Sequence, residues 1–175
     1  LRQKNTLYNA GISGQPDLMV PIGEELSRGV EFDVSGRILP YWSIMASYAF
    51  NVAEISKAPE GTKDLNLQRP GTPRHSANLW TKFIVPTGML RNLGIGVGLN
   101  GVSERKGQVG RRENVVSYPG YALLNLALYY KVREVQLQLN LNNALNKQYY
   151  ISGYDRLRSF PGAPRNINLT ATYRF

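Results

Sequence analysis

The sequence ends in Ile167-Asn-Leu-Thr-Ala-Thr-Tyr-Arg-Phe175, where apolar or aromatic residues alternate with polar ones up to the last residue. Successive side chains of a β-strand point to opposite faces, so this stretch predicts a strand with one apolar and one polar face. A tilted strand of about ten residues is long enough to cross a bilayer. The ending therefore predicts a strand of a transmembrane β-barrel.

The same alternation recurs along the rest of the chain. It is clearest in Val135–Asn142, where Val135, Leu137, Leu139 and Leu141 alternate with glutamines and asparagines. No segment shows a sustained helical period of apolar residues. We therefore predict an all-β fold, the wall of an antiparallel transmembrane β-barrel with about eight strands. The expected strands cover residues 4–8, 27–38, 42–52, 75–85, 93–102, 120–131, 135–142 and 167–175.

Composition narrows the possible classes of protein. The 175 residues carry a net charge of +9 and contain no cysteine, which excludes disulfides and thiolate metal sites. No apolar run approaches the ~18 residues that a membrane helix needs. The basic charge favours anionic lipid or nucleic acid as partners. No basic start followed by an apolar stretch opens the sequence, so we expect that a leader was removed or that the chain is a piece of a longer protein.

The connections between the expected strands alternate in length, as in outer-membrane barrels with short periplasmic turns and long extracellular loops. Connections 39–41, 86–92 and 132–134 are short, whereas 11–23, 53–74, 104–119 and 152–164 are long. If Phe175 lies at the periplasmic end, every short connection falls on that side. Aromatic residues also gather near the strand ends, as in interfacial girdles. For the periplasmic girdle and the C-terminal assembly signal we predict Trp42, Tyr129, Tyr173 and Phe175.

Three other readings stay open at this point. The alternation also suits a soluble sandwich or a lipocalin-like barrel, although such folds turn their apolar face inward. A basic β-protein that binds nucleic acid would carry its aromatic residues among Lys and Arg on one exposed sheet face. A self-standing eight-stranded outer-membrane barrel with a structural or adhesin role would be filled by its own side chains. Against the last, Gly94, Gly96 and Gly98 predict a nearly bare wall that faces a wide lumen or a closely approaching backbone.

Several motifs resemble the TonB-dependent siderophore receptors. Residues 27–36, Ser-Arg-Gly-Val-Glu-Phe-Asp-Val-Ser-Gly, resemble the SRGVE segment of that family. Residues 140–150, Asn-Leu-Asn-Asn-Ala-Leu-Asn-Lys-Gln-Tyr-Tyr, are similar to its N-x-N-N-x-x-D-K-x-Y-Y signature, with Asn146 where the family often has Asp. The similarity extends in order over 42–51, 73–80, 119–121 and 162–165.

The resemblance implies that residues 1–175 are the C-terminal part of a 22-stranded barrel whose plug domain is absent from this chain. It implies a bacterial outer-membrane receptor for TonB-energised uptake of a ferric siderophore or similar nutrient, without enzymatic activity or a cofactor. The implied partners are outer-membrane lipid and lipopolysaccharide, the outer-membrane assembly machinery, the siderophore, and the TonB-ExbB-ExbD complex acting through the missing plug. Nucleic acid is not among them.

Ligand contacts are expected in the outer loops, which combine basic and aromatic side chains. Arginine binds carboxylate and phosphate in a bidentate manner, and aromatic rings add stacking surface. The candidates are Arg105, Arg111, Arg112, Tyr118, Tyr149, Tyr150, Tyr154, Arg156 and Arg158. No catalytic set and no metal site is predicted: for the single histidine, His75, we expect a structural role. The run Gly94–Gly98 lacks the following helix that a dinucleotide-binding loop requires.

Overall fold

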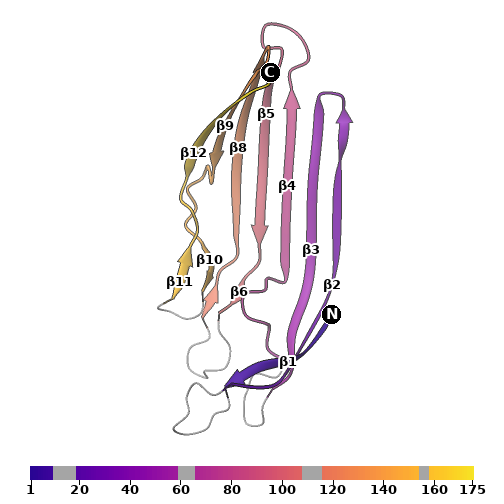
Figure 1. Ribbon diagram of the computed structural model, residues 1–175, viewed down its shortest axis with the longest axis vertical. Helices are drawn as coiled ribbons and strands as arrows, with labels where there is room; N and C mark the ends of the chain where they lie inside the picture. The colour runs from indigo at the N-terminus through magenta and orange to yellow at the C-terminus, as the bar shows by residue number, and fades with distance from the viewer. Residues whose placement is uncertain (10–18, 59–65, 108–115, 154–157) are drawn as a thin grey trace.

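The computed structural model describes residues 1–9, 19–58, 66–107, 116–153 and 158–175. Eight strands form one antiparallel sheet in which each strand pairs with the next one along the chain (Figure 1). This confirms the predicted all-β class and strand number. The strands of the sheet are β1 (Arg2–Asn9), β2 (Met19–Leu39), β3 (Trp42–Lys57), β4 (His75–Ile84), β5 (Leu93–Val102), β8 (Tyr121–Val132), β9 (Val135–Asn142) and β12 (Asn166–Tyr173).

The two ends of the sheet differ. The turns β2–β3, β4–β5 and β8–β9 lie at one end together with the C-terminus, which we call the turn end (Figure 1). The described parts of the longer connections lie at the opposite end, which we call the loop end. Two short ribbons stand there: β6 (Arg105–Lys106) pairs with β7 (Ser117–Tyr118), and β10 (Tyr150–Gly153) pairs with β11 (Ser159–Pro161). The alternation of short and long connections predicted from sequence is therefore present.

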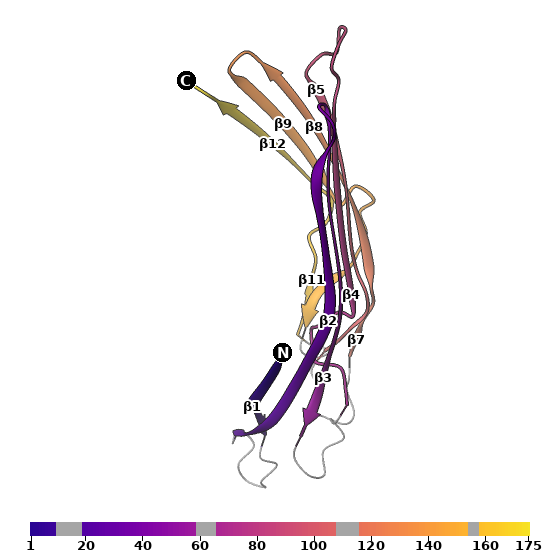
Figure 2. The same ribbon diagram turned by 90° about the vertical axis from the view of Figure 1, so that its right-hand side faces the viewer.

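The sheet is a thin curved wall (Figure 2). In the described part of the chain, only Ala53, Ile55, Tyr118 and Ala127 are buried apolar residues, and no side chain is less than 2% exposed. Leucines of the apolar face stay open, with Leu139 at 38% and Leu169 at 71% exposure. A soluble sandwich would bury this face in a packed core. In the described residues that core is absent, so the apolar face needs a covering that the chain does not supply. Among those residues, no helix is long and apolar enough to span a bilayer.

Two strands extend beyond their predicted bounds. β2 begins at Met19 rather than near residue 27, and β3 continues to Lys57 rather than ending near residue 52. Their added parts pair with each other from Glu24 opposite Lys57 onward. In this region the regular alternation breaks down, because Glu24 and Glu25 are adjacent in β2, while Ala53 and Ile55 of β3 are only 4% and 3% exposed. Arg2 holds Glu24 by a 2.5 Å ion pair, and Arg69 holds Glu25 by one of 2.8 Å.

The wall of glycines in β5 is covered rather than bare. A Cβ added at Gly98 would lie 2.6 Å from Cζ3 of Trp80, and one added at Gly96 would lie 2.7 Å from Cζ2 of the same ring. At Gly94 the nearest atom would be Cβ of Tyr129, at 3.0 Å. The ammonium group of Lys82 lies 3.9 Å from the centre of the Tyr129 ring. The prediction of a nearly bare wall is wrong, because side chains of β4 and β8 lie flat over the glycines.

Candidate functional site

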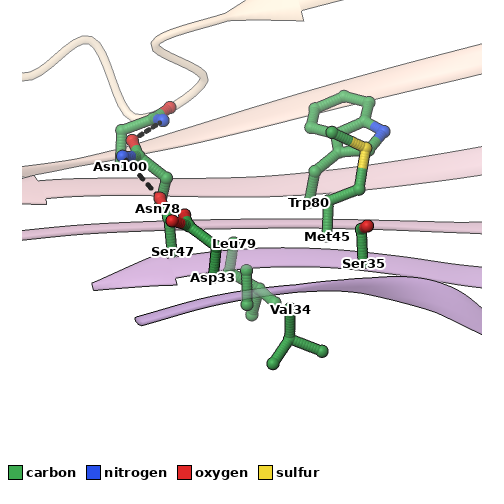
Figure 3. A pocket seen from close by; sticks show the side chains of 10 residues that line it. Asp33, Val34, Ser35, Met45, Ser47, Asn78, Leu79, Trp80 and Asn100 are labelled. Atoms are coloured by element: carbon green, nitrogen blue, oxygen red, sulfur yellow. Dashed lines mark hydrogen bonds between the residues drawn. The ribbon is translucent and has the colours of Figure 1, made fainter. Parts of the chain in front are cut away.

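The strand register assigns side chains to the two faces of the sheet. Ser47 on β3, Asn78 on β4 and Asn100 on β5 are directly opposite one another, and Asp33 on β2 faces Ser47. All of these residues belong to the polar face, which is the inner face if the apolar face meets lipid. Near them, Met45 and Trp80 border an open hollow of about 340 Å³ (Figure 3).

A chain of amide hydrogen bonds crosses the polar face. The backbone N–H of Asn143 donates to Oδ1 of Asn125 (2.9 Å), whose Nδ2 donates to Oδ1 of Asn100 (2.6 Å). Nδ2 of Asn100 donates to Oδ1 of Asn78 (2.6 Å), and Nδ2 of Asn78 donates to Oγ of Ser47 at 3.2 Å (Figure 3). Every amide donates in the same direction, from the turn after β9 back to β3. We call this series the amide ladder. It links strands β3, β4, β5 and β8, directly across from Ser47 to Asn100 and diagonally from Asn100 to Asn125.

The amide ladder predicts a measurable effect of Asn100→Ala. The substitution removes two hydrogen bonds, each contributing about 1 kcal/mol net, so we expect unfolding of the intact protein to cost about 1–2 kcal/mol less. Asn168→Ala is the matched control, because Asn168 donates only within its own strand, to Asn166. Urea titration of both variants folded into lipid vesicles measures the difference. Equal destabilisation of the two would show that the amide ladder adds nothing beyond ordinary surface polarity.

The family-like asparagine signature builds a turn after β9. Asn143 is 3% exposed and has a φ of 48°. Its Oδ1 accepts from the N–H of Lys147 (2.8 Å), while its Nδ2 donates to the carbonyls of Lys147 and Ala163. Asn146, with a φ of 51°, accepts from the N–H of Arg165 at 3.1 Å. Asparagine tolerates the left-handed region and bonds to nearby backbone, so this segment ties β9 to the approach of β12.

The loop end brings several predicted ligand-binding residues together. The ring centre of Tyr149 lies 4.3 Å from that of Tyr121, with the two rings tilted by 48°, and Tyr150 is 46% exposed. Arg158 is exposed just before β11. Tyr149, Tyr150 and Arg158 are therefore grouped near β10 and β11, and a role in ligand contact stays a prediction. Four further candidates, Arg111, Arg112, Tyr154 and Arg156, lie outside the described residues.

Two of the predicted ligand-binding residues are buried instead. Arg105 is 6% exposed and Tyr118 is 3% exposed, because the β6–β7 ribbon packs against β10. A ligand arriving from outside meets neither side chain in this arrangement. The structure therefore does not present Arg105 and Tyr118 at the surface, and contact of either residue with ligand stays a prediction. The basic and aromatic character of a loop indicates nothing about whether a neighbouring loop covers it.

Three of the predicted girdle residues lie on the apolar face near the turn end. Trp42 pairs with Phe83 and donates from Nε1 to Oγ1 of Thr81 (2.8 Å). Tyr173 pairs with Val135, and its ring lies 6.4 Å from that of Phe175. Their membership of an interfacial girdle stays a prediction.

The structure corrects the prediction that Tyr129 is a girdle residue. It pairs with Gly94 and Gln138 and lies on the polar face with Lys82. It therefore cannot belong to a lipid-facing girdle. Its alternation with Leu128 and Tyr130 already contained this information.

His75 takes part in a contact between side chains on the apolar face. Its Nδ1 lies 2.9 Å from Oη of Tyr48, and its ring centre lies 5.1 Å from that of Phe50. Within the described ranges, no cluster of three or more His, Cys, Asp or Glu residues could hold a metal ion.

Charge at the loop end is partly paired. Lys106 forms an ion pair with Glu104, and the hydrogen bond from Lys106 lowers the pKa of that carboxyl. The hydrogen bond from Arg2 likewise lowers the pKa of Glu24. Because both carboxylates are at the surface, water and salt screen these pairs, and each adds little to stability.

Sequence reasoning missed the amide ladder. Its members Asn78, Asn100 and Asn125 are single polar residues on three separate strands, and only the register brings them together: Asn78 is opposite Asn100, and Asn125 is opposite Gly98, two residues from Asn100. The sequence does show an asparagine at a polar-face position in each of these strands. Predicting that these asparagines contact one another requires knowledge of which residues pair between the strands.

Comparison with known proteins identifies the family. The family model described as "TonB dependent receptor-like, beta-barrel" matches residues 1–144. The metal-pseudopaline receptor CntO of Pseudomonas aeruginosa strain UCBPP-PA14 is 27% identical over 180 residues, covering all of this chain and 24% of the relative. The catecholate siderophore receptor Fiu of Escherichia coli K12 is 30% identical over 159 residues, covering 87% of this chain and 20% of the relative. The chain thus spans about a quarter or less of the length of these relatives.

Solved structures agree on the fold. The closed-form crystal structure of Fiu from E. coli K12 superposes with a TM-score of 0.78 at 24% identity, over 99% of this chain and 24% of the other. The siderophore receptor PiuA from Acinetobacter baumannii also gives 0.78 at 24% identity, over 98% and 25%. An outer-membrane location follows from the family match, and it accounts for an apolar face with no protein covering. The chain belongs to the TonB-dependent receptor family, and its eight-stranded sheet is part of the family's β-barrel.

Proposed function

We propose that the intact protein carrying this chain captures a ferric siderophore or a similar metal chelate at the loop end and takes it up with energy delivered through TonB. The observation that carries this proposal is the family match over residues 1–144. The printed names of the relatives support the cargo class: they are receptors for metal-pseudopaline and for catecholate siderophores. No observation favours the alternative of a self-standing barrel with an adhesin role.

In that proposal the eight-stranded sheet forms part of the barrel wall, and its loop end forms part of the rim, by which we mean the edge of the barrel that faces the ligand. The apolar face meets lipid, the polar face meets the lumen, and Tyr149, Tyr150 and Arg158 supply part of the rim that a chelate would touch. We assign no reaction and no resident cofactor to this wall, so the metal chelate is cargo. TonB-ExbB-ExbD would act through a plug outside these residues. Lipopolysaccharide at the rim, and assembly machinery that reads the ending at Phe175, would be the other partners.

Uptake of radiolabelled chelates tests the proposal. The intact protein is expressed in a strain without its own siderophore receptors and offered ferric catecholates, ferric pyoverdines and metal-loaded pseudopaline. We expect at least one chelate to accumulate, and accumulation to stop when TonB is deleted. Accumulation that continues without TonB, or none with any of the three classes while the protein is folded in the outer membrane, would contradict the proposal.

A further inference from the structure

Arg105 is a buried cation at the loop end. Its guanidinium group donates through Nη1 to the carbonyl of Ile151 and through Nη2 to the carbonyl of Tyr150, the latter at 2.6 Å. The guanidinium carbon lies 5.3 Å from the centre of the Tyr121 ring. Burying a charge is costly unless hydrogen bonds satisfy it. Here the acceptors are two successive backbone carbonyls of β10, so the bonds fix the position of the strand itself.

Tyr118 makes a second fastening between the same two ribbons. Its hydroxyl shares a 3.0 Å hydrogen bond with Oγ of Ser159, and its ring centre lies 5.9 Å from that of Tyr150. The hydroxyl occupies the space where Gly153 has no side chain, since a Cβ added there would overlap it. Arg105 of β6 is thus the pairing partner of Tyr118 of β7, and both side chains contact the β10–β11 ribbon.

The geometry of the guanidinium group makes Arg105 hard to replace. Its planar fork of donors reaches two adjacent carbonyls at once, whereas the ammonium group of lysine is a compact point charge without a fork. Among the described residues, Nε of Arg105 has no hydrogen-bond partner. The cost of burying the guanidinium group is offset by its hydrogen bonds to the two carbonyls and by its contact with the Tyr121 ring. Moving β10 away removes both hydrogen bonds together.

We propose that Arg105 is a positioning residue that holds the β6–β7 and β10–β11 ribbons together as one unit. Through β10 it sets the place of Tyr150, an exposed side chain of the rim. Arg105 acts without touching the ligand. The part of this inference that concerns ligand capture rests on the proposed function, whereas the fastening of the ribbons stands independently of it.

Distance measurement between the ribbons tests the fastening directly. Cysteines introduced at the exposed Ser117 and Ser152, in the intact protein freed of any other accessible cysteine, carry spin labels for double electron–electron resonance. We expect one narrow distance distribution with Arg105 present. Arg105→Gln should broaden it at least twofold, and Arg105→Lys should broaden it less, because one ammonium group restores one of the two carbonyl contacts. Arg74→Gln is the matched control, since it removes one cation from the same end of the wall, and the ion-pair partner of Arg74 is Glu54 of β3 rather than a residue of either ribbon.

The outcomes separate clearly. An unchanged distribution in Arg105→Gln overturns the proposal. If Arg105→Gln fails to assemble, Arg105→Lys decides, and an unchanged distribution in that variant overturns the proposal as well. Broadening in Arg74→Gln equal to that in Arg105→Gln also overturns it, because the effect would then follow the loss of surface charge.

Ligand binding supplies the second measurement. Apparent affinity falls in proportion to the fraction of molecules whose site is correctly arranged. If the aligned arrangement drops to about a tenth, the Kd of the transported chelate should rise about tenfold in Arg105→Gln and less in Arg105→Lys. Broadened distances with unchanged affinity would overturn the positioning role while leaving the fastening intact. If no chelate binds the unaltered protein, the proposed function fails, and the distance measurement still decides the role of Arg105.

Discussion

Leu139→Arg is expected to abolish assembly of the barrel. Leu139 lies in the middle of β9 on the apolar face, opposite Leu128 and Leu169, and it is 38% exposed with no protein covering it. An arginine at the bilayer midplane of such a strand costs about 2–4 kcal/mol. The measurement is the yield of intact protein in the outer-membrane fraction, with folding read from its heat-modifiable gel mobility.

Gln138→Arg is the matched control for that substitution. Gln138 is the preceding residue of the same strand, yet it faces the polar side opposite Thr170 and Tyr129. The same charge in the same strand should therefore leave the yield close to that of the unaltered protein. A normal yield of Leu139→Arg, or equal losses in both variants, would contradict the assignment of the apolar face to lipid.

Gly29→Ala should be the other severe substitution. Gly29 pairs with Asn51, and a Cβ added to it would fall on the carbonyl oxygen of Phe50 and lie 3.0 Å from Cα of Asn51. These atoms are backbone, so no side-chain rotation relieves the overlap and β2 must separate from β3. Overpacking of this kind costs about 3 kcal/mol. The urea midpoint of the intact protein in lipid vesicles should fall accordingly.

Gly36→Ala gives the comparison within the same strand. A Cβ added at Gly36 meets nothing within 4 Å, so this variant should keep the original midpoint or exceed it slightly. If Gly29→Ala and Gly36→Ala behave alike, the close approach of β2 and β3 at Phe50 is not a constraint on the sequence. The glycine of the SRGVE segment would then need an explanation other than packing.

Sequence alone predicted those parts of the fold that one strand can encode by itself. In β9, the leucines lie on the apolar face and the side-chain amides on the polar face. This alternation predicts both that the segment is a strand and which residues belong to each face. The asparagine signature at residues 140–150 was also visible as a family resemblance, although the turn that Asn143 builds was not predicted from it. Each of these features depends on contacts between residues close in sequence, or on a single environment along a whole face of the strand.

The features that sequence could not predict depend on pairing between distant segments. The outer part of β2 reads Met-Val-Pro-Ile-Gly-Glu-Glu-Leu from Met19 to Leu26, which has no regular alternation, so only its pairing with β1 and β3 reveals it as a strand. Trp80 covers Gly96 and Gly98 from another strand, and Arg105 is buried by β10, 45 residues along the chain. The candidate ligand site suffered most, because its residues were chosen by type. Whether an arginine meets ligand or backbone is decided by which loop packs beside it.

The length of β2 has a consequence for whatever approaches from outside the cell. Its 21 residues extend about 70 Å along the strand, and a tilt near 40° still leaves a rise of about 50 Å, well above the ~30 Å hydrocarbon core. β3, which is antiparallel to β2, extends beside it toward the loop end, whereas β4 and β5 stop short of that level (Figure 1). Within the described part of the wall, the β2–β3 pair therefore projects further beyond the hydrocarbon core than β4 and β5 do, and a molecule that approaches this part of the loop end meets the side of that pair.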